Sequence, residues 1–390
     1  MKPLEGITVV ELATHFAAPA CGRVLSAQGA RIIKVESAKG EPCRKFGPVL
    51  GNPIKPDENP IFEIYNGGKE DIVLNMRDPE DQEKLRRILE QVDVFITNNR
   101  PGILKSMGLD YDSIRERCPR LVYGLLSAYG EKGEKYNDSG FDSIAFWANS
   151  GFLQDMSVPV EGGYPVYIPM GIADTCCGTI LAGAIGTALY NRTKTGKGDC
   201  VSTSLWGTAV WAMAMMSTGT QYGYQWPRER YQGSPMGVPL KTKDGKWVLS
   251  VVEAYDRDWP AFCRAWKCED LIDNPRFNNR NATLDPVNRK DAVMEVEKRA
   301  ILCDSGDVDK ALTKANIVHT VLSHIKDLHS DKQALENHFL YEHTYPSGKT
   351  VTLANPCVQF RSFENNDFEP APELGADTER ILKEFGIGEE

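Results

Sequence analysis

The sequence predicts an α/β fold with a Rossmann-like large domain and a smaller α+β domain. Between residues 7 and 127, short runs rich in β-branched residues alternate with stretches of helical periodicity. Alternating strands and helices form a parallel sheet with right-handed crossovers, which places helices on both of its faces. A chain of 390 residues also exceeds one ordinary hydrophobic core, so two domains are expected.

The expected elements of the large domain follow one another in a regular order. In the helix at residues 79–91, Leu85, Ile88 and Leu89 fall on one face, as an amphipathic helix requires. A second helix is expected at residues 19–29, and a long one, rich in small residues, from about residue 174 to Tyr190. The strands are expected at residues 7–12, 30–36, 71–75, 92–97 and 121–127.

The later part of the chain changes character. Residues 205–226 are rich in Trp and Met and are expected to form a buried connecting helix. A hairpin turn at 242–246 precedes a strand at 247–252, residues 256–329 look mostly helical, and 347–353 look like a strand. The domains are therefore expected at 1–204 (large domain, first part), 205–226 (linker helix), 227–325 (small domain) and 326–390 (return to the large domain).

Composition and charge exclude several classes of protein. A formal net charge of −9 argues against a nucleic-acid partner. No apolar run looks long enough to span a membrane, and residues 1–5 lead straight into a strand rather than a signal peptide. The ten cysteines and six histidines lack metal-site spacing. We therefore expect a cytoplasmic protein without a metal, a membrane partner or a permanently bound cofactor.

The loop after the first strand lacks the glycine fingerprint of nicotinamide enzymes. Residues 13–19 read Ala-Thr-His-Phe-Ala-Ala-Pro, with no G-x-G-x-x-G. A hydride-transferring dehydrogenase is therefore disfavoured, although the sheet type would allow one.

Asp174 stands at the start of the long small-residue helix. Aspartate is a preferred N-cap, so a structural cap is one interpretation of its position. The alternative is chemical: amide groups and the helix dipole at the N-terminus favour an ionised carboxylate, which can attack an activated acyl group. The segment alone favours the cap.

Six segments in order resemble one family, the class III coenzyme A transferases. This family includes formyl-CoA, carnitine and 2-hydroxyacyl-CoA transferases and the 2-methylacyl-CoA racemases. The similarity spans nearly the whole chain. The matching segments are residues 3–12, 29–36, 98–102 with 107–109, 119–124, 195–198 and 374–378.

The resemblance implies a homodimer whose subunits interlock like chain links, and a covalent role for Asp174. In that mechanism the carboxylate attacks an acyl-CoA, which gives an acyl-aspartyl anhydride and CoA thiolate. The thiolate then forms an aspartyl-CoA thioester, from which a small carboxylic acid takes the coenzyme. CoA and acyl-CoA are thus substrates.

The resemblance also implies where CoA binds. The expected contacts lie in the loop after the first strand and in basic or amide residues near other strand ends. They are His15, Phe16, Ala17, Ala18, Lys34, Arg44, Asn98, Asn99, Arg100 and Lys105.

Three departures from the family pattern matter. Ser106 occupies a place where many relatives carry Arg, and Lys105 is a substitute. The glycine-rich loop that covers some active sites is not evident, and residues 232–237 are a candidate for it. The racemases carry a histidine where this chain has Phe141, and no nearby histidine is evident, so two-base racemisation is disfavoured.

The acid acceptor is predicted from overall similarity. The chain most resembles the branch that acts on 2-hydroxy acids derived from amino acids in anaerobic fermentation, such as (R)-2-hydroxy-4-methylpentanoate or aryl-lactates. Carnitine-type acids are the alternative, since a quaternary ammonium binds in aromatic cages. Trp206, Trp211, Tyr222 and Tyr224 offer the aromatic rings for one.

Overall fold

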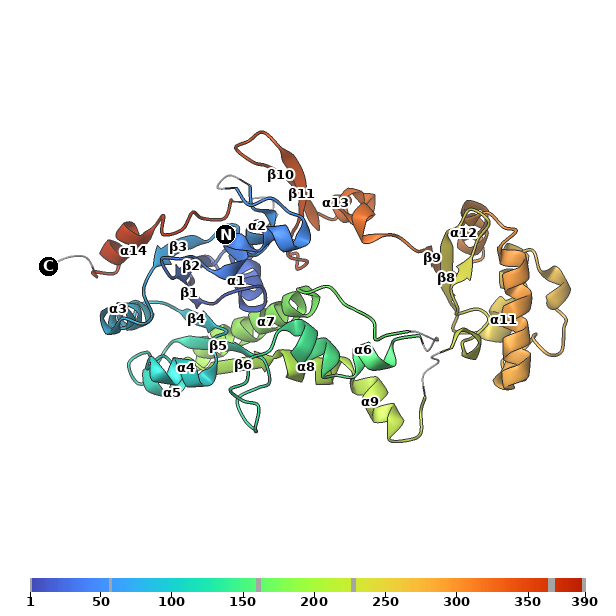
Figure 1. Ribbon diagram of the computed structural model, residues 1–390, viewed down its shortest axis with the longest axis horizontal. Helices are drawn as coiled ribbons and strands as arrows, with labels where there is room; N and C mark the ends of the chain where they lie inside the picture. Colours follow the sequence, from blue (N-terminus) through green and yellow to red (C-terminus); the bar gives the residue numbers. More distant parts are fainter. Residues whose placement is uncertain (1, 56–57, 159–162, 226–228, 364–368, 388–390) are drawn as a thin grey trace. The chain divides into compact units, whose positions relative to one another are not determined.

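The computed structural model describes residues 2–55, 58–158, 163–225, 229–363 and 369–387, which fall into two units (Figure 1). Unit 1 contains Met1–Gln154, Tyr167–Met215 and His329–Glu390. Unit 2 contains Asp155–Val166 and Met216–Leu328.

A six-stranded parallel sheet forms the centre of unit 1. The strand order is β3-β2-β1-β4-β5-β6, so the direction of winding reverses between β1 and β4. Sheets of this order bind ligands outside the carboxyl ends of the strands at the reversal point. The expectation of an α/β fold with a parallel sheet is confirmed. The strands are β1 (Thr8–Leu12), β2 (Arg31–Glu36), β3 (Glu70–Val73), β4 (Val94–Thr97), β5 (Val122–Ser127) and β6 (Cys200–Ser204).

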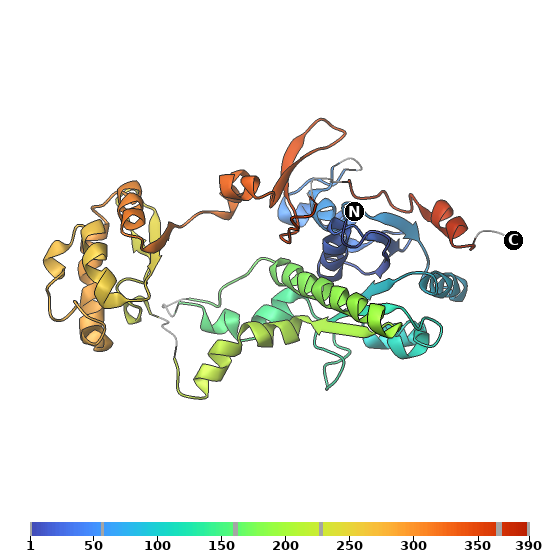
Figure 2. The same ribbon diagram turned by 180° about the vertical axis from the view of Figure 1, so that it is seen from behind.

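Helices cover both faces of this sheet, as Figures 1 and 2 show. Neighbouring residues of β1 point to opposite faces: Val9 joins one apolar core and Val10 the other. The first core contains α1 (Ala17–Ala27), η3 (Asp142–Ala148), α7 (Ile172–Thr195) and α8 (Leu205–Ala212). The second contains α3 (Pro79–Leu89), α4 (Pro101–Ser106), α5 (Tyr111–Ile114) and α14 (Thr378–Glu384).

The helix α7 is long and apolar enough to cross a membrane by length and composition alone. The expectation that no run reaches that length is therefore wrong for Ile172–Thr195. Half of its most apolar window is buried inside the protein, where the helix packs on α1 and the sheet. It is a core helix of unit 1 in this structure.

Residues 205–226 do not form the single buried helix that was expected. The described part contains α8 and α9 (Ala214–Thr220), which are separate helices, and Trp226 lies outside the described residues. Leu205 and Ala209 are buried, but Trp211 is 79% and Met215 is 86% exposed. Apolar composition alone does not distinguish a core helix from one with an exposed apolar face.

The C-terminal part of the chain returns to the edge of the sheet at β3. The Asp377 carboxylate accepts a hydrogen bond of 3.0 Å from the Asp71 amide, and the Thr378 hydroxyl accepts one of 3.0 Å from the Val73 amide. The remaining elements of unit 1 and those at its boundary with unit 2 are η1 (Pro42–Lys45), η2 (Gly47–Leu50), α2 (Pro60–Asn66), α6 (Phe152–Asp155), η7 (Ile325–Ser330), α13 (Lys332–Glu336), β10 (Leu340–Thr344) and β11 (Thr350–Ala354).

Unit 2 is an antiparallel sheet with helices packed around a separate core. Trp259 and Phe262 of α10 (Tyr255–Ala265) and Trp266, which follows its last residue, are fully buried in this core. The strand β9 lies in a region expected to be mostly helical, and it pairs with β8. The elements are η4 (Arg230–Gln232), β7 (Leu240–Lys241), β8 (Trp247–Val251), α10 (Tyr255–Ala265), η5 (Glu269–Leu271), η6 (Ala282–Leu284), α11 (Pro286–Ala300), α12 (Ser305–Lys314) and β9 (Val318–Val321).

Candidate active site

A cavity of about 370 Å³ lies at the carboxyl ends of the central strands of unit 1. Its walls come from the segments that follow β1, β4 and β5, and Asp174 of α7 is among the lining residues. This is the reversal point of the sheet, where parallel α/β sheets bind their ligands. We call this cavity the switch-point pocket.

The loops after β1 and β4 are tied to each other by amide side chains. Asn98 forms two hydrogen bonds with the backbone of Thr14: its Oδ1 accepts from the amide at 3.1 Å, and its Nδ2 donates to the carbonyl at 2.7 Å. Asn99 Nδ2 donates to the Leu12 carbonyl at 3.0 Å. Two asparagines in sequence therefore fix the register of the two loops that flank the pocket.

Asp174 does not cap its helix. The helix α7 begins at Ile172, and Gly171, with φ of +94°, is its N-cap residue. Asp142 supplies a side chain at this end instead, because its Oδ2 accepts a hydrogen bond of 2.7 Å from the Gly171 amide. The cap interpretation of Asp174 is therefore wrong, and the residue lines the switch-point pocket.

Burial and, to a lesser extent, the nearby charge of Asp142 raise the pKa of the Asp174 carboxyl to about 7. Only 7% of the residue is exposed to solvent. The helix N-terminus was expected to favour the ionised form of this group, but desolvation is the larger effect and favours the neutral form. Near neutral pH the group exists in both forms.

A glycine brings α7 against α1. A Cβ atom built on Gly178 would lie 2.2 Å from the Ala17 carbonyl oxygen and 2.8 Å from the Ala20 Cβ. Because no side chain separates the helices there, the first turn of α7 lies beside the start of α1. This contact positions Asp174 next to the loop after β1.

His15 lies in that loop in an unusual backbone conformation. Its φ is +64°, which non-glycine residues rarely adopt, and its imidazole is half-buried. Burial lowers the pKa of His15, while Glu41 raises it and Lys34 lowers it. The ring centroid lies 5.3 Å from that of Phe141. No substitute for the racemase histidine was evident near position 141 in the sequence between His15 and His319, but the fold brings His15 itself beside Phe141.

The structure gathers five of the expected CoA contacts and Asp174 around one pocket: His15, Ala17, Asn98, Asn99 and Arg100. Phe16 and Ala18 point elsewhere. Phe16 is buried in a small cluster with Cys43 and Phe62, and Ala18 has no exposed surface.

The three other expected contacts do not line the pocket. The Lys34 ammonium is fully buried and lies 3.2 Å from Glu11, so it is not available at the surface. Arg44 pairs with Glu36 at 2.8 Å and lines a separate cavity of about 1090 Å³. Lys105 is exposed in the last turn of α4. A basic residue near a strand end is thus insufficient evidence for a ligand contact.

Sequence analysis missed one wall of the pocket. Ser127 ends β5, and Tyr136, Asp138, Ser139 and Phe141 follow it in the loop leading to η3. A signal was present, because a loop after a strand next to the reversal point lies at the same edge of the sheet.

The other expected features lie outside this pocket. Of residues 232–237, Ser234, Met236 and Gly237 line a cavity of about 730 Å³ within unit 2. Of the four aromatic residues considered for a cage, the two that belong to unit 1, Trp206 and Trp211, do not line the switch-point pocket. Within the described ranges, no group of three His, Cys, Asp or Glu residues is arranged to hold a metal ion.

Comparisons with known proteins agree on one family. The family model described as CoA-transferase family III matches residues 4–378. The chain is 36% identical over 389 residues to the (R)-2-hydroxy-4-methylpentanoate CoA-transferase of Clostridioides difficile, covering 99% of this chain and 96% of the relative.

Two further relatives extend the comparison. The cinnamoyl-CoA:phenyllactate CoA-transferase of Clostridium sporogenes is 32% identical over 390 residues, covering 99% of this chain and 94% of the relative. The crystal structure of a CAIB/BAIF family protein from Brucella suis has a TM-score of 0.80 at 25% identity and covers 98% of this chain and 99% of that one.

Proposed function

The chain belongs to CoA-transferase family III and is an enzyme of that class, and from this premise we propose that it transfers coenzyme A from an acyl-CoA to a free 2-hydroxy acid through Asp174. The exchange of one thioester for another is nearly balanced in energy. The enzyme therefore needs a nucleophile, correct positioning and exclusion of water.

Asp174 is the proposed nucleophile. Its carboxylate adds to the thioester carbonyl of the donor, and the C–S bond breaks to leave an acyl-aspartyl anhydride and CoA thiolate. The thiolate attacks the Asp174 carbonyl and releases the donor acid, which leaves an aspartyl-CoA thioester. The acceptor carboxylate then attacks this thioester, and the same steps in reverse give the new acyl-CoA and free Asp174.

The position of Asp174 is the observation that carries this proposal. The carboxyl group is nearly buried, lines the switch-point pocket and has a pKa of about 7. A carboxylate of raised pKa is more basic, and therefore more nucleophilic, than an ordinary aspartate once it is ionised. Burial also protects the anhydride and thioester from water.

CoA binding is proposed for the loops around the same pocket. His15, Ala17, Asn98 and Asn99 supply backbone and side-chain groups at the reversal point of the sheet, and Arg100 supplies an exposed positive charge at the start of α4. A guanidinium suits the phosphate groups of CoA.

For the acceptor, we propose a branched aliphatic 2-hydroxy acid such as (R)-2-hydroxy-4-methylpentanoate, with aryl-lactates as the alternative. Both relatives described above are named for acids of these two kinds, and each match covers nearly the whole chain. A carnitine-type acid is less favoured, because the two candidate cage residues of unit 1, Trp206 and Trp211, are not among the residues lining the pocket of Asp174.

The working assembly is proposed to be an interlocked homodimer in the cytoplasm. Large apolar side chains on α7, α8 and α9 are exposed in the single chain, including Ile180 at 47%, Trp211 at 79% and Met215 at 86%. Exposed apolar surface of this kind is typical of a protein interface. A second copy of the chain is the partner that the family resemblance implies.

A panel of acids tests the proposed function. Purified protein is incubated with one acyl-CoA donor and each of 2-hydroxy-4-methylpentanoate, phenyllactate and carnitine, and new thioesters are separated by chromatography. We expect the fastest exchange with the (R) form of the first acid. Incorporation of deuterium at the α-carbon from D₂O without exchange of CoA would indicate a racemase instead, and no reaction with any pair would contradict the proposal.

A further inference from the structure

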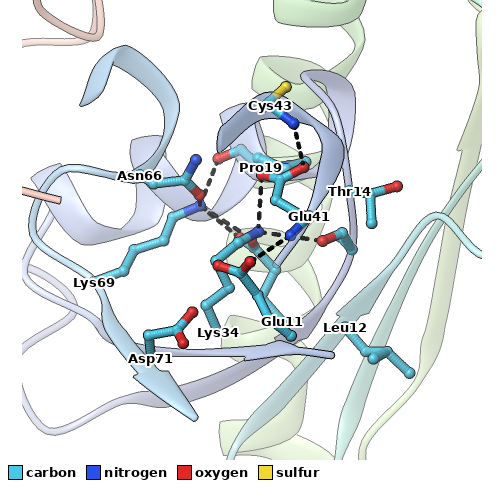
Figure 3. A network of polar contacts seen from close by, with 12 residues as sticks. Glu11, Leu12, Thr14, Pro19, Lys34, Glu41, Cys43, Asn66, Lys69 and Asp71 are labelled. Atoms are coloured by element: carbon cyan, nitrogen blue, oxygen red, sulfur yellow. Dashed lines mark hydrogen bonds and ion pairs between the residues drawn. The ribbon is translucent and has the colours of Figure 1, made fainter. Parts of the chain in front are cut away.

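A buried network of charged residues lies beneath the loop after β1 (Figure 3). The Lys34 ammonium lies 3.2 Å from Glu11 Oε1 and 3.4 Å from Glu41 Oε1, and the Lys69 ammonium lies 2.8 Å from Glu11 Oε2. All four residues are buried. Two carboxylates and two ammonium groups balance in charge, which reduces the cost of burying them.

The network ends on the backbone of the active-site loop. Glu41 Oε2 accepts a hydrogen bond of 2.8 Å from the His15 amide. Lys34 Nζ donates to the Ala13 carbonyl at 3.2 Å, and Lys69 Nζ donates to the Pro19 carbonyl at 3.1 Å. Three backbone atoms between residues 13 and 19 are therefore held by side chains from other segments.

This loop has a conformation that requires such support. His15 has a φ of +64°, and a non-glycine residue keeps a positive φ only where its surroundings impose it. The Glu41 carboxylate holds the amide of this same residue. His15 and Ala17 then form the wall of the switch-point pocket beside Asp174.

A glycine in α1 also leaves room for the side chains of the network. A Cβ atom on Gly22 would lie 2.0 Å from Glu11 Oε2 and 3.2 Å from Lys69 Nζ. Any side chain at this place in α1 would displace the carboxylate that lies between the two lysines. The network is thus built into the packing of α1 on the sheet.

We propose that Glu41 is a positioning residue for CoA transfer, which fixes the His15 backbone and thereby the wall of the pocket that faces Asp174. This inference rests on the proposed function of that pocket. Lys34, expected from the sequence to touch CoA, acts here from beneath the loop, by orienting Glu41 and holding the Ala13 carbonyl.

One lysine of the network favours its neutral form. Burial lowers the pKa of Lys69 to about 8, against the attraction of Glu11 and, to a smaller extent, of Glu41. Loss of the Glu41 carboxylate therefore lowers the pKa of Lys69 further, which reduces the charge imbalance that the loss leaves behind. Variants at position 41 are therefore expected to fold.

Two variants and one control test the proposal. Glu41→Ala removes the acceptor for the His15 amide, and kcat/KM for the acyl-CoA is expected to fall by roughly 100-fold. Glu41→Gln keeps an acceptor oxygen and is expected to restore activity to within about tenfold of the wild type. Asp93→Ala is the control, because Asp93 binds the Thr8 amide at the opposite end of β1 and pairs with Arg192.

The control is expected to lower Tm while kcat/KM stays within about twofold of the wild type. Hydrogen exchange at residues 13–16 is expected to be slow in the wild type and fast in Glu41→Ala only. Glu41→Ala kinetics equal to those of Asp93→Ala, or Glu41→Gln as slow as Glu41→Ala, would overturn the proposal.

The hydrogen-exchange measurement also separates two kinds of failure. If the wild type does not transfer CoA, the proposed function fails. Slow hydrogen exchange at residues 13–16 still tests whether Glu41 holds the His15 amide. If Glu41→Ala does not fold, the Glu41→Gln kinetics and the wild-type exchange decide. Wild-type exchange at residues 13–16 as fast as in the exposed loop 131–139 would overturn the proposal.

Discussion

Asp142 lies at the N-terminus of the helix that carries Asp174, and the two carboxyl groups interact. Asp142 accepts a hydrogen bond from the Gly171 amide, and its charge contributes to the raised pKa of Asp174. The residue at position 142 therefore holds the start of α7, while the residue at 174 faces the pocket. Two acids near one helix end have different tasks because only one of them occupies the capping geometry.

The pH dependence of the reaction follows from this pair. Activity requires ionised Asp174, so kcat/KM is expected to fall as the pH drops below about 7. Asp142→Asn removes the like charge but keeps an acceptor for the Gly171 amide. The acid limb of the pH profile should then move to lower pH. Asp138→Asn, at an exposed position of the pocket wall, is the control and should leave the acid limb in place. An acid limb that does not move in Asp142→Asn would refute the electrostatic interaction between Asp142 and Asp174.

Asp174→Asn is expected to abolish exchange and stabilise the fold at high pH. The folded-state pKa is raised from 3.8 to about 7, so the contribution of Asp174 to stability is complete below pH 3.8 and is lost as the pH rises through 7. Because the amide side chain introduced at this position stays neutral, we expect the free energy of unfolding of Asp174→Asn to exceed that of the wild type by roughly 2–4 kcal/mol at pH 8. Denaturant titration should show this gain at pH 8 and none near pH 3, and an equal difference at both pH values would contradict the explanation.

The contact between α1 and α7 makes Gly178 sensitive to substitution. Gly178→Ala places a methyl group against the Ala17 carbonyl and is expected to destabilise the fold by about 1–3 kcal/mol and to reduce kcat. Gly183→Ala on the same helix has open space around it and should stabilise the helix by about 0.5–1 kcal/mol. Equal effects of both substitutions on Tm and kcat would argue against close packing at residue 178.

Arg100 caps the start of α4 and Lys105 lies in its last turn, and substitutions at the two positions distinguish two explanations of CoA binding. Arg100 lines the pocket and Lys105 does not. Arg100→Gln should raise KM for the acyl-CoA by roughly 5- to 30-fold, an effect that weakens in high salt, whereas Lys105→Gln should leave it nearly unchanged. The reverse order of effects would place the phosphate contact at Lys105.

The strands of the large unit could be predicted from the sequence because their short runs are rich in Val, Ile and Leu and most of their residues are buried. The strands expected at 7–12, 30–36, 71–75, 92–97 and 121–127 correspond to β1 to β5 within a few residues. The strand β6 was missed, since it is an edge strand with the polar sequence Cys-Val-Ser-Thr-Ser and has one buried residue. The strand β9 was also missed; it is an edge strand too, and none of its four residues is buried.

The sheet topology determines which loops surround the candidate site, because loops that follow neighbouring parallel strands lie at the same edge of the sheet. Loops after β1 and β4 must lie at the same edge, and His15 and Asn98, both expected from the family resemblance to contact CoA, line the same pocket there. The burial of a charged residue could not be predicted from its own identity and immediate neighbours in the sequence. Lys34 alternates with apolar residues in β2 and resembles an exposed lysine until its carboxylate partners from other segments are known. The pKa of Asp174 depends in the same way on Asp142, which lies 32 positions earlier in the sequence.

The most direct test of the account is mass spectrometry of enzyme quenched during turnover with an acyl-CoA and its acceptor acid. The account predicts a CoA thioester on the peptide that contains Asp174, which hydroxylamine converts to a hydroxamate at that residue. The adduct should be absent in Asp174→Asn. An active enzyme with no adduct on this peptide, or with the adduct on Asp142 or Glu36, would contradict the central claim.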